Sequence, residues 1–453
     1  MDHQLKRSLK VRDLVLFGLA FMSPVAAMTI FGIVTLVAEG HSVLAYVIGF
    51  IAMLFTAISF GKMVEVYPSS GSTYTYVKNT FHEKLGFMAG WGMLLDYILL
   101  PVLMFSLSAT YTHALIPNIP IWAWVLIYAI PITTINVLGI DMAAKLNMVL
   151  VVVMLSAVIL FIVVAVNYLM TGGFTIIDFK AIYNPDTFKF NAIIGGAAIS
   201  TLAYLGFDAI TTLTEETNEN VTSKKISFAI IIALAIQTLL FISVTYFAMV
   251  ILKDYTLIGN PDTAFIEVLQ IISGPAVQIF ITLTLIISGV AAGLASQSVA
   301  SRLLFNIGRD NGLPKAFFAY LHPKYKTPAK NVVLVGVIAI AGAVMFSMTY
   351  IADFVAFGGL LGFMFVNLAV IYHYFIKTKQ RNIIANLLLP LIGFSVCLYL
   401  ILGLSIRSQI FGLCWLLVGG TVMILTSAVK NNTLLIEETS DELHVHTAKQ
   451  TLH

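Results

Sequence analysis

Long apolar runs alternate with short polar segments along the chain, and the runs define its predicted architecture. A hydrocarbon core about 30 Å thick requires roughly 20 apolar residues for one helical crossing. Twelve runs reach this length, so the pattern predicts an all-α polytopic membrane protein with twelve transmembrane helices. The runs cover residues 14–38, 43–62, 86–113, 120–139, 146–170, 192–214, 227–252, 275–304, 331–349, 353–376, 384–405 and 409–429.

Composition and charge agree with this pattern. Charged residues make up 10% of the chain, whereas ordinary soluble domains carry about 25%. When twelve spans are placed in order, one set of loops and ends holds all but four of the 25 lysines and arginines. The positive-inside rule assigns this set to the cytoplasm, together with residues 1–13 and the polar tail 431–453. We therefore expect a multi-pass protein of the cytoplasmic membrane with both termini inside the cell.

Several functional classes lack their sequence signals. The two cysteines, Cys397 and Cys414, have neither metal-ligand spacing nor a disulfide pattern. No P-loop, serine elbow or metalloprotease motif occurs. Basic residues are scattered along short loops, which gives no support to nucleic-acid binding. The sequence predicts a protein that is not an enzyme and that uses no cofactor or metal.

The sixth apolar run contains a carboxylate at membrane depth. Its segment 193–217 includes Gly195, Gly196 and Gly206, which weaken a continuous helix. Asp208, Thr211, Thr212 and Glu215 recur at i, i+3, i+4 and i+7, the spacing of one α-helical face. An interrupted helix with this polar stripe is typical of a transport site, because a lone charge in hydrocarbon needs a partner or a water-filled cavity. For Asp208 alone, a packed kink whose acid caps free backbone groups is an equally good interpretation.

The first apolar run carries a comparable interruption. Pro24 removes a backbone donor, and the flanking glycines loosen the backbone, so we expect a break between Pro24 and Thr29. Breaks in spans one and six fit an inverted repeat of five spans, residues 14–170 against 171–376, followed by two further spans in residues 377–430. Unwound segments at matching positions mark a midplane site whose free backbone groups suit a zwitterion or an amine. A proline kink without a ligand is the alternative.

The third apolar run also contains an acid. Asp96 lies about 15 Å beyond Gly86 if the run is helical, which is deep in the membrane. It can meet a cationic substrate, relay a proton or hydrogen-bond to a neighbouring helix. We favour the structural hydrogen bond.

Three motifs resemble the amino acid–polyamine–organocation superfamily over nearly the whole chain. They are FTAISFGKMVEVYPSSGSTYTYV (55–77), AYLGFDAITTLTEET (203–217) and ASRLLFNIGRDNGLPKAFFAYLHPKYKTP (300–328). Within this superfamily, the segments GFMAGWGMLLDYILLP and GFDAITTLTEET are most similar to those of bacterial putrescine-importer-like permeases. The resemblance implies the five-plus-five fold of the leucine transporter, with substrate between spans one, three, six, eight and ten. It also implies secondary active uptake or exchange of amino acids or amines, often coupled to protons.

Some positions depart from the family pattern. Many amino-acid members have a glycine-rich run in span one where this chain has Ala27, Met28 and Thr29. Putrescine importers carry an aspartate at the position of Thr29. A span-five lysine implicated in proton coupling aligns with Met154, and a gating aromatic residue of span six aligns with Leu202. These differences favour a neutral amino acid over a diamine.

The resulting hypothesis is a permease for an amino acid or related small amine that works by alternating access, with proton coupling. The alternatives are a putrescine or polyamine importer of the same fold and a nutrient sensor that does not transport. The expected gating or coupling residues are Asp96, Leu202, Asp208 and Glu215. The expected substrate-binding residues are Ala26, Ala27, Met28, Thr29, Ile30, Ala203, Tyr204, Gly206 and Phe207.

Overall fold

The computed structural model describes residues 7–261, 264–346 and 348–425, and these residues are mostly helical with one isolated β-bridge. The predicted polar tail 431–453 lies outside the described residues. The α-helices are α1 (Val11–Met22), α2 (Ala26–Thr29), α3 (Phe31–Val37), α4 (Ser42–Val66), α5 (Ser72–Thr80), α6 (Glu83–Leu115), α7 (Ile121–Leu138), α8 (Ile140–Thr171), α9 (Phe190–Leu202), α10 (Ser223–Leu252), α11 (Ala264–Ile272), α12 (Pro275–Arg309), α13 (Lys315–Phe318), α14 (Ala329–Met345), α15 (Met348–Val370) and α16 (Leu389–Gly403). The 3₁₀ segments are η1 (Phe179–Ala181), η2 (Phe207–Glu216) and η3 (Tyr255–Leu257), the π-helical segments are η4 (Ile371–Lys377) and η5 (Ile384–Leu388), and a last helix covers Ile406–Leu425.

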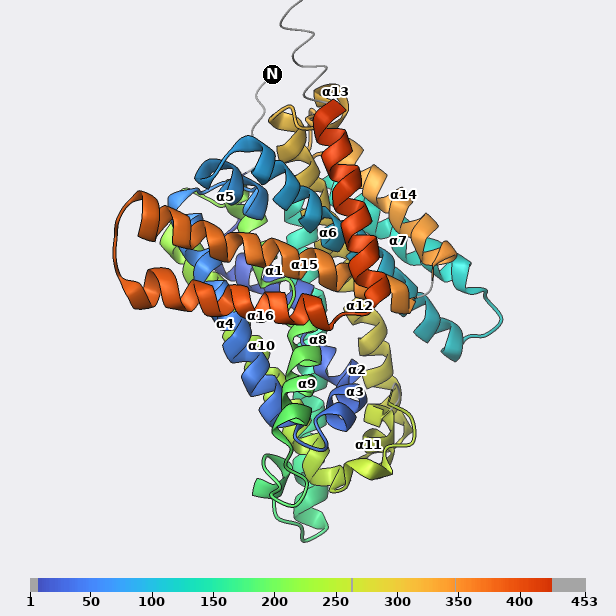
Figure 1. The fold of residues 1–453 in the computed structure, drawn as a ribbon. Coiled ribbons are helices and arrows are strands. Elements are labelled where there is room, and N and C mark those ends of the chain that lie inside the picture. The colour runs from blue at the N-terminus through green and yellow to red at the C-terminus, as the bar shows by residue number, and fades with distance from the viewer. Residues whose placement is uncertain (1–6, 262–263, 347, 426–453) are drawn as a thin grey trace, which may run out of the picture.

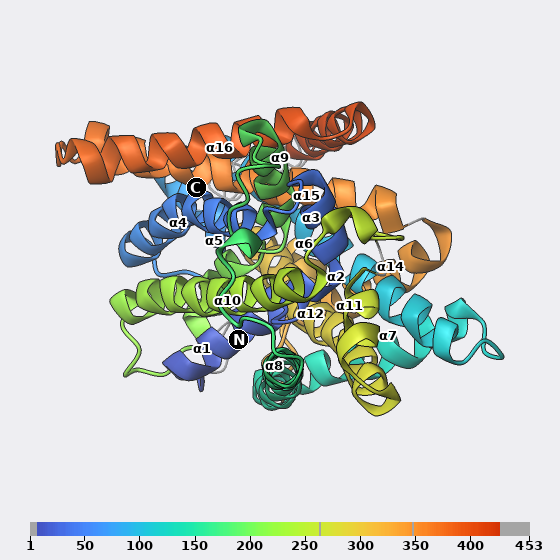
Figure 2. The same cartoon turned by 90° about the horizontal axis from the view of Figure 1, so that it is seen from below.

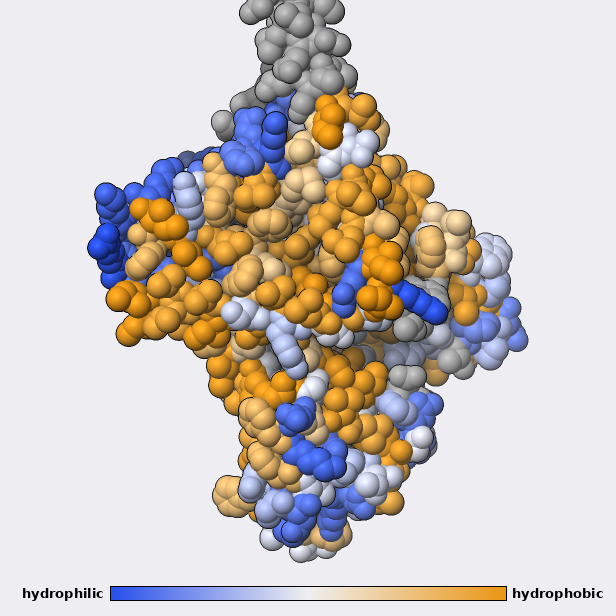
Figure 3. All heavy atoms as spheres, in the orientation of Figure 1, coloured by the Kyte–Doolittle hydropathy of each residue, from blue (hydrophilic) through white to orange (hydrophobic). Residues whose placement is uncertain are grey.

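The fold is that of a multi-pass membrane protein. Among the described residues, 11 helical segments are long and apolar enough to cross a bilayer. The predicted run 331–349 corresponds to α14, which is a shorter apolar helix of 17 residues. Figure 3 shows hydrophobic residues over most of the visible face and hydrophilic residues gathered towards the extremities. This distribution is the one that a lipid environment requires, because exposed apolar side chains replace the usual polar surface.

The first span is interrupted as predicted, but the break is displaced. α1 ends at Met22, and Ser23 adopts φ = +58°. The residue before a proline is sterically disfavoured in the α region, so the helix ends before Pro24 rather than after it. Ala26–Thr29, which were expected in the break, form the single turn α2, and Ile30 separates this turn from α3.

The sixth span breaks between α9 and η2. Residues 203–206 form turns, and Gly206 adopts the left-handed conformation with φ = +118°. A Cβ atom on Gly206 would lie 2.0 Å from Phe21 Cδ1, so only glycine allows this contact between the breaks of spans one and six. The two breaks therefore pack directly against each other.

The second half of span six differs from the expected α-helical face. η2 is a 3₁₀-helix with about three residues per turn, so positions i and i+3 align and positions i+4 and i+7 do not. Asp208 and Thr211 lie on one face, whereas Glu215 lies on another. The predicted single polar stripe is thus divided between two sets of partners.

The helices surround the broken spans. α5 and α13 lie towards the upper end of the molecule in Figure 1, and α3 and α11 lie towards the lower end. In the view from below, α16 borders one side, α8 borders the opposite side, and α12 lies between them (Figure 2). α6 packs along both α12 and α15. α6, α12 and α15 border the region where the two breaks meet.

Candidate substrate cavity between the broken helices

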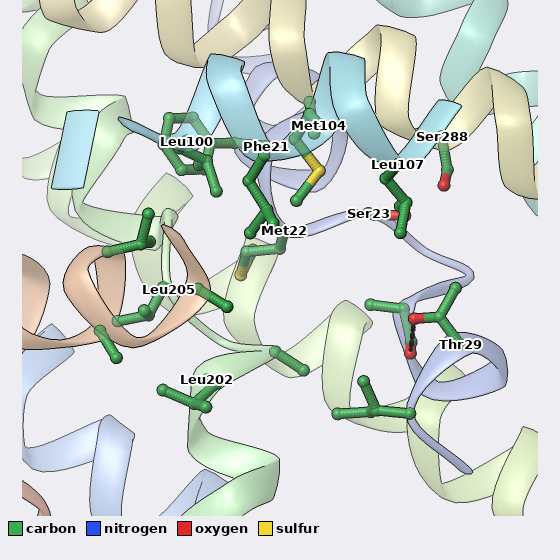
Figure 4. Close-up of a pocket in the computed structure, with 18 residues that line it drawn as sticks. Phe21, Met22, Ser23, Thr29, Leu100, Met104, Leu107, Leu202, Leu205 and Ser288 are labelled. Carbon is green, nitrogen blue, oxygen red and sulfur yellow. Dashed lines mark hydrogen bonds between the residues drawn. The ribbon is translucent and has the colours of Figure 1, made fainter. Parts of the chain in front are cut away.

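A cavity of about 240 Å³ lies where the two broken spans meet α6, α12 and α15. Figure 4 shows side chains from these elements pointing into it. Among the described residues that line it, none is charged, and Ser23, Thr29 and Ser288 supply the side-chain hydroxyls. The remaining lining is apolar and comprises Phe21, Met22, Ala26, Ile30, Leu100, Leu103, Met104, Leu107, Leu202, Ala203, Leu205, Ala292, Ala352, Val355 and Ala356.

Local hydrogen bonds hold the break of span one in place. The Thr29 hydroxyl donates to the Ala26 carbonyl at 2.7 Å, the contact dashed in Figure 4. The Gln237 amide donates to the Ser23 carbonyl at 2.7 Å, which satisfies an oxygen released where α1 ends. The Ser23 hydroxyl contacts the Met154 sulfur at 3.7 Å. Met154 therefore lies beside the break, at the position where some members of the superfamily have a lysine.

The predicted binding residues separate into two groups. Ala26, Thr29, Ile30, Ala203 and the gating candidate Leu202 line the cavity. The others are buried beside it but are not part of the lining: Ala27, Met28, Tyr204, Gly206 and Phe207.

Tyr204 and Phe207 pack away from the cavity in this conformation. The Tyr204 hydroxyl donates to the Tyr46 carbonyl at 3.0 Å. The Phe207 ring contacts Phe60 and Phe363, with ring centroids 5.8 Å and 5.1 Å away. Both residues stabilise the neighbourhood of the break through contacts with α4, α10 or α15.

Other lining residues were not identified individually from the sequence. The side chains from α6, α12 and α15 are mostly leucine, alanine and valine in continuous apolar runs. Such runs contain no signal that separates a cavity-facing residue from a packed one. Gln237 carried a usable signal, because an amide inside an apolar span needs a hydrogen-bond partner.

Asp208 and Asp96 lie outside the cavity lining and are buried. The Tyr97 hydroxyl donates to Asp208 Oδ2, while Asp208 Oδ1 has no partner among the described residues. Asp96 Oδ1 likewise has no partner among those residues. A Cβ atom on Gly359 would lie 3.0 Å from Asp96 Oδ2 and 3.3 Å from Leu205 Cδ2, which places Asp96 close to a lining residue.

Two ion pairs join η2 to α12, and we call them the latch. Arg309 donates to both carboxylate oxygens of Glu215 at 2.9 Å and 3.0 Å. Arg302 forms a bidentate pair with Glu216, and the side chains of both residues are buried. Glu215 also accepts hydrogen bonds from Ser69 and the Ser70 amide. The sequence identified Glu215 but missed Glu216, because two adjacent acids at a predicted helix end resemble a solvated terminus.

The N-terminal segment covers the same end of η2. The Ser8 and Leu9 amides donate to the Glu216 carbonyl, and the Asn218 amide donates to the Leu9 carbonyl at 2.9 Å. The Ser8 hydroxyl donates to Asp141 at 2.5 Å, which extends the contact to α8. The end of span six nearest the N-terminus is therefore closed by the latch and by this backbone pairing.

α5 adds a third connection at this end. The Tyr74 hydroxyl and the Lys78 ammonium both donate to Asp310, at 2.9 Å and 2.7 Å. Burial and the adjacent Asp310 carboxylate raise the pKa of Tyr74, so its hydroxyl stays protonated and donates. Along the chain, the cavity residues of span one follow the N-terminal segment, and those of span six precede the latch. The cavity is therefore set back from the end of the molecule that these contacts close.

This arrangement defines the class of protein. An apolar cavity between two broken membrane spans, closed at one end by ion pairs, is the layout of a transporter site. A family model described as amino acid permease matches residues 14–427. The chain belongs to the amino acid permease family, and it is a transporter and not an enzyme.

Curated relatives agree with this assignment. The low-affinity putrescine importer PlaP of Escherichia coli K12 is 36% identical over 92% of each chain. The methylthioribose transporter of Bacillus subtilis is 27% identical over 93% of this chain and 94% of its own. The branched-chain amino acid permease BcaP of Bacillus subtilis is 26% identical over 94% of both chains.

Proposed function

We propose that the protein carries a neutral amino acid with an aliphatic side chain across the cytoplasmic membrane as a secondary active transporter. The observation that carries this proposal is the apolar lining of a cavity that lies between two breaks. An aliphatic side chain gains free energy by leaving water for such a surface, at about 25 cal/mol per Å². The cavity of about 240 Å³ suits a small solute, since sites for drug-sized ligands run from roughly 300 Å³ upward.

The charged end of the amino acid binds the backbone at the breaks. The turn Ala26–Thr29 and residues 203–206 place helix termini beside the cavity, where the backbone dipoles favour ions of opposite sign. Thr29 adds a hydroxyl from within the lining. Leu202 covers the bound side chain, and Tyr204 turns towards it in another conformation of the cycle.

The proposed fold has twelve spans in a five-plus-five inverted repeat. Residues 14–170 and 171–376 form the repeats, and residues 377–430 form the last two spans. α14 is the ninth span, and its 17 residues reach about 26 Å, close to the hydrocarbon thickness. The positive-inside rule favours a cytoplasmic N-terminus and tail, and on this topology the latch acts as the cytoplasmic gate, with Glu215 as one of its residues.

Protons drive uptake in this proposal, and Asp96 and Asp208 bind them. Both carboxylates are buried and each has an oxygen without a partner among the described residues. The span-five position that carries a lysine in some relatives is Met154, which cannot titrate.

Putrescine import is the second candidate. The 36% identity to the importer PlaP favours it, and so does the position of Asp96 behind Leu205. To bind a diamine, the cavity would need a carboxylate, and Asp96 could reach it only if Leu205 moved. The present lining offers no anion for a second ammonium group.

Uptake into proteoliposomes separates these candidates. Labelled leucine, alanine and putrescine are supplied with and without an inward proton gradient. The proposal predicts gradient-stimulated leucine uptake that excess putrescine does not inhibit, whereas putrescine uptake would support the second candidate. Binding without any flux would indicate a sensor.

A further inference from the structure

The hairpin between α15 and α16 carries a pocket that the transport mechanism does not use. The pocket measures about 420 Å³ and is lined by Phe375, Ile376, Lys379, Arg381 and Ile383. It lies at the hairpin tip between η4 and η5, where Figure 1 shows the chain reversing at the far left. In Figure 3 this tip shows hydrophilic residues immediately beside hydrophobic ones.

The charged residues at this tip, and in a long stretch of sequence around it, are all basic. Lys377, Lys379 and Arg381 occur within five residues, and no aspartate or glutamate occurs between Asp353 and Glu437. All three cations are exposed and form no ion pair among the described residues. Lys379 and Arg381 line the pocket, and Lys377 lies two residues before Lys379 in the sequence, so this basic site attracts an anionic group.

Apolar side chains continue the pocket on the hairpin surface. Ile376, Ile383 and Ile384 are 55%, 56% and 65% exposed. Aliphatic side chains of this exposure beside a basic loop match a molecule with an anionic head and a hydrocarbon body. A free phosphate or a sugar phosphate would use the cations but would make no contact with these isoleucines.

The loop is held in shape before any ligand binds. The Gln380 amide donates to the Tyr374 carbonyl at 2.9 Å, and the Asn386 amide donates to the Gln380 carbonyl at 2.7 Å. Lys62 of α4 donates to Asn386 Oδ1 at 2.7 Å and also to the Ala385 carbonyl. The cations are therefore presented by a fixed backbone, which reduces the entropy cost of binding.

We propose that this pocket binds the headgroup of an anionic phospholipid, with the acyl chains along the exposed isoleucines. The lipid joins α15, which lines the substrate cavity, to α16 at the end of the molecule that carries the N-terminus. Cations near an anionic membrane surface each contribute roughly fivefold in affinity. Removal of all three should lower affinity on the order of a hundredfold on the same basis.

Native mass spectrometry of the purified protein tests the proposal. The wild-type chain is titrated with phosphatidylglycerol or phosphatidylcholine, and retained lipids are counted. The triple variant K377Q/K379Q/R381Q should lose a tightly bound phosphatidylglycerol, and the matched variant K224Q/K225Q/K315Q, which removes exposed cations elsewhere, should retain it. Equal retention by wild type and triple variant, or equal retention of the two lipids by wild type, would overturn the proposal.

Two further arms identify the source of the anion. Glycerol phosphate should fail to displace phosphatidylglycerol at equal concentration, because it lacks the acyl chains. The variant I376S/I383S should bind the lipid more weakly while its monodispersity and leucine uptake remain unchanged. Displacement by glycerol phosphate alone would show a soluble-phosphate site in place of a lipid site.

Discussion

Gly206 shows how one residue sets the geometry of the cavity. Its φ of +118° and the 2.0 Å approach to Phe21 mean that a side chain at this position meets both backbone strain and a clash. The glycine was visible in the sequence as a weak point in a helix. Its contact with span one was not, because no local pattern encodes which distant ring fills the vacant Cβ position.

We expect Gly206→Ala to abolish leucine uptake and to lower thermal stability. Strained backbone alone costs about 1–3 kcal/mol, and the alanine Cβ also displaces Phe21 from the cavity lining. Gly173→Ala is the control, since Gly173 has φ = +68° but nothing within 4 Å of its Cβ position. Uptake and melting temperature in detergent are measured for both variants. A smaller effect for Gly206→Ala than for Gly173→Ala would contradict the close-packing account.

Thr29 is the residue at which substrate charge can be tested. Thr29→Asp places a carboxylate in an uncharged lining, so putrescine uptake should rise relative to leucine uptake because the second ammonium gains a partner. Thr29→Asn controls for size and polarity. The ratio of the two uptake rates in proteoliposomes is the measurement. An unchanged ratio in Thr29→Asp would place the substrate elsewhere.

A larger residue at Thr29 tests the cavity itself. Thr29→Trp should fill the space and reduce leucine uptake to background, whereas Ile51→Trp on the exposed face of α4 should leave uptake near the wild-type rate. Surface expression measured for both variants separates loss of transport from loss of protein. Normal uptake by Thr29→Trp would mean that the substrate does not pass through this cavity.

At the scale of elements, the sequence predicts that both breaks exist, but it does not give their exact position or helical form. Pro24 and Gly206 identified both interruptions, because proline and glycine act through local backbone geometry. The start of the first break at Ser23 and the 3₁₀ form of η2 depend on how neighbouring helices pack around the two breaks, which the local sequence does not encode. The polar stripe was therefore assigned the wrong helical period, and the buried Arg302–Glu216 pair was missed.

The latch provides a prediction for this scale. Arg302→Leu leaves the Glu216 carboxylate buried without its partner, which costs about 3–5 kcal/mol. The double variant R302L/E216L should recover much of this loss, because no isolated charge remains. Melting temperatures of wild type, both single variants and the double variant complete a mutant cycle. The exposed Lys189–Glu39 pair is the control, and Lys189→Leu should change stability little. An Arg302→Leu variant as stable as Lys189→Leu would show that the latch does not hold this end together.

At the scale of the whole molecule, the apolar pattern determined the membrane architecture. Runs of about 20 residues are a direct consequence of bilayer thickness, so the sequence could predict nearly every span. The cavity could not be located residue by residue, because it is bounded by ordinary leucine, alanine and valine side chains from separate elements. The transporter assignment came from the motifs, the family match and the meeting of two broken spans.

The central claim is that this cavity binds a neutral aliphatic amino acid. Thr29→Cys in a Cys414→Ser background places one accessible thiol in the cavity, since Cys397 is buried. The rate of its modification by a small water-soluble thiol reagent is measured in proteoliposomes with leucine, with putrescine and without ligand. The account predicts that leucine slows the reaction in a saturable way and that putrescine at the same concentration does not. Protection by putrescine and not by leucine would contradict it.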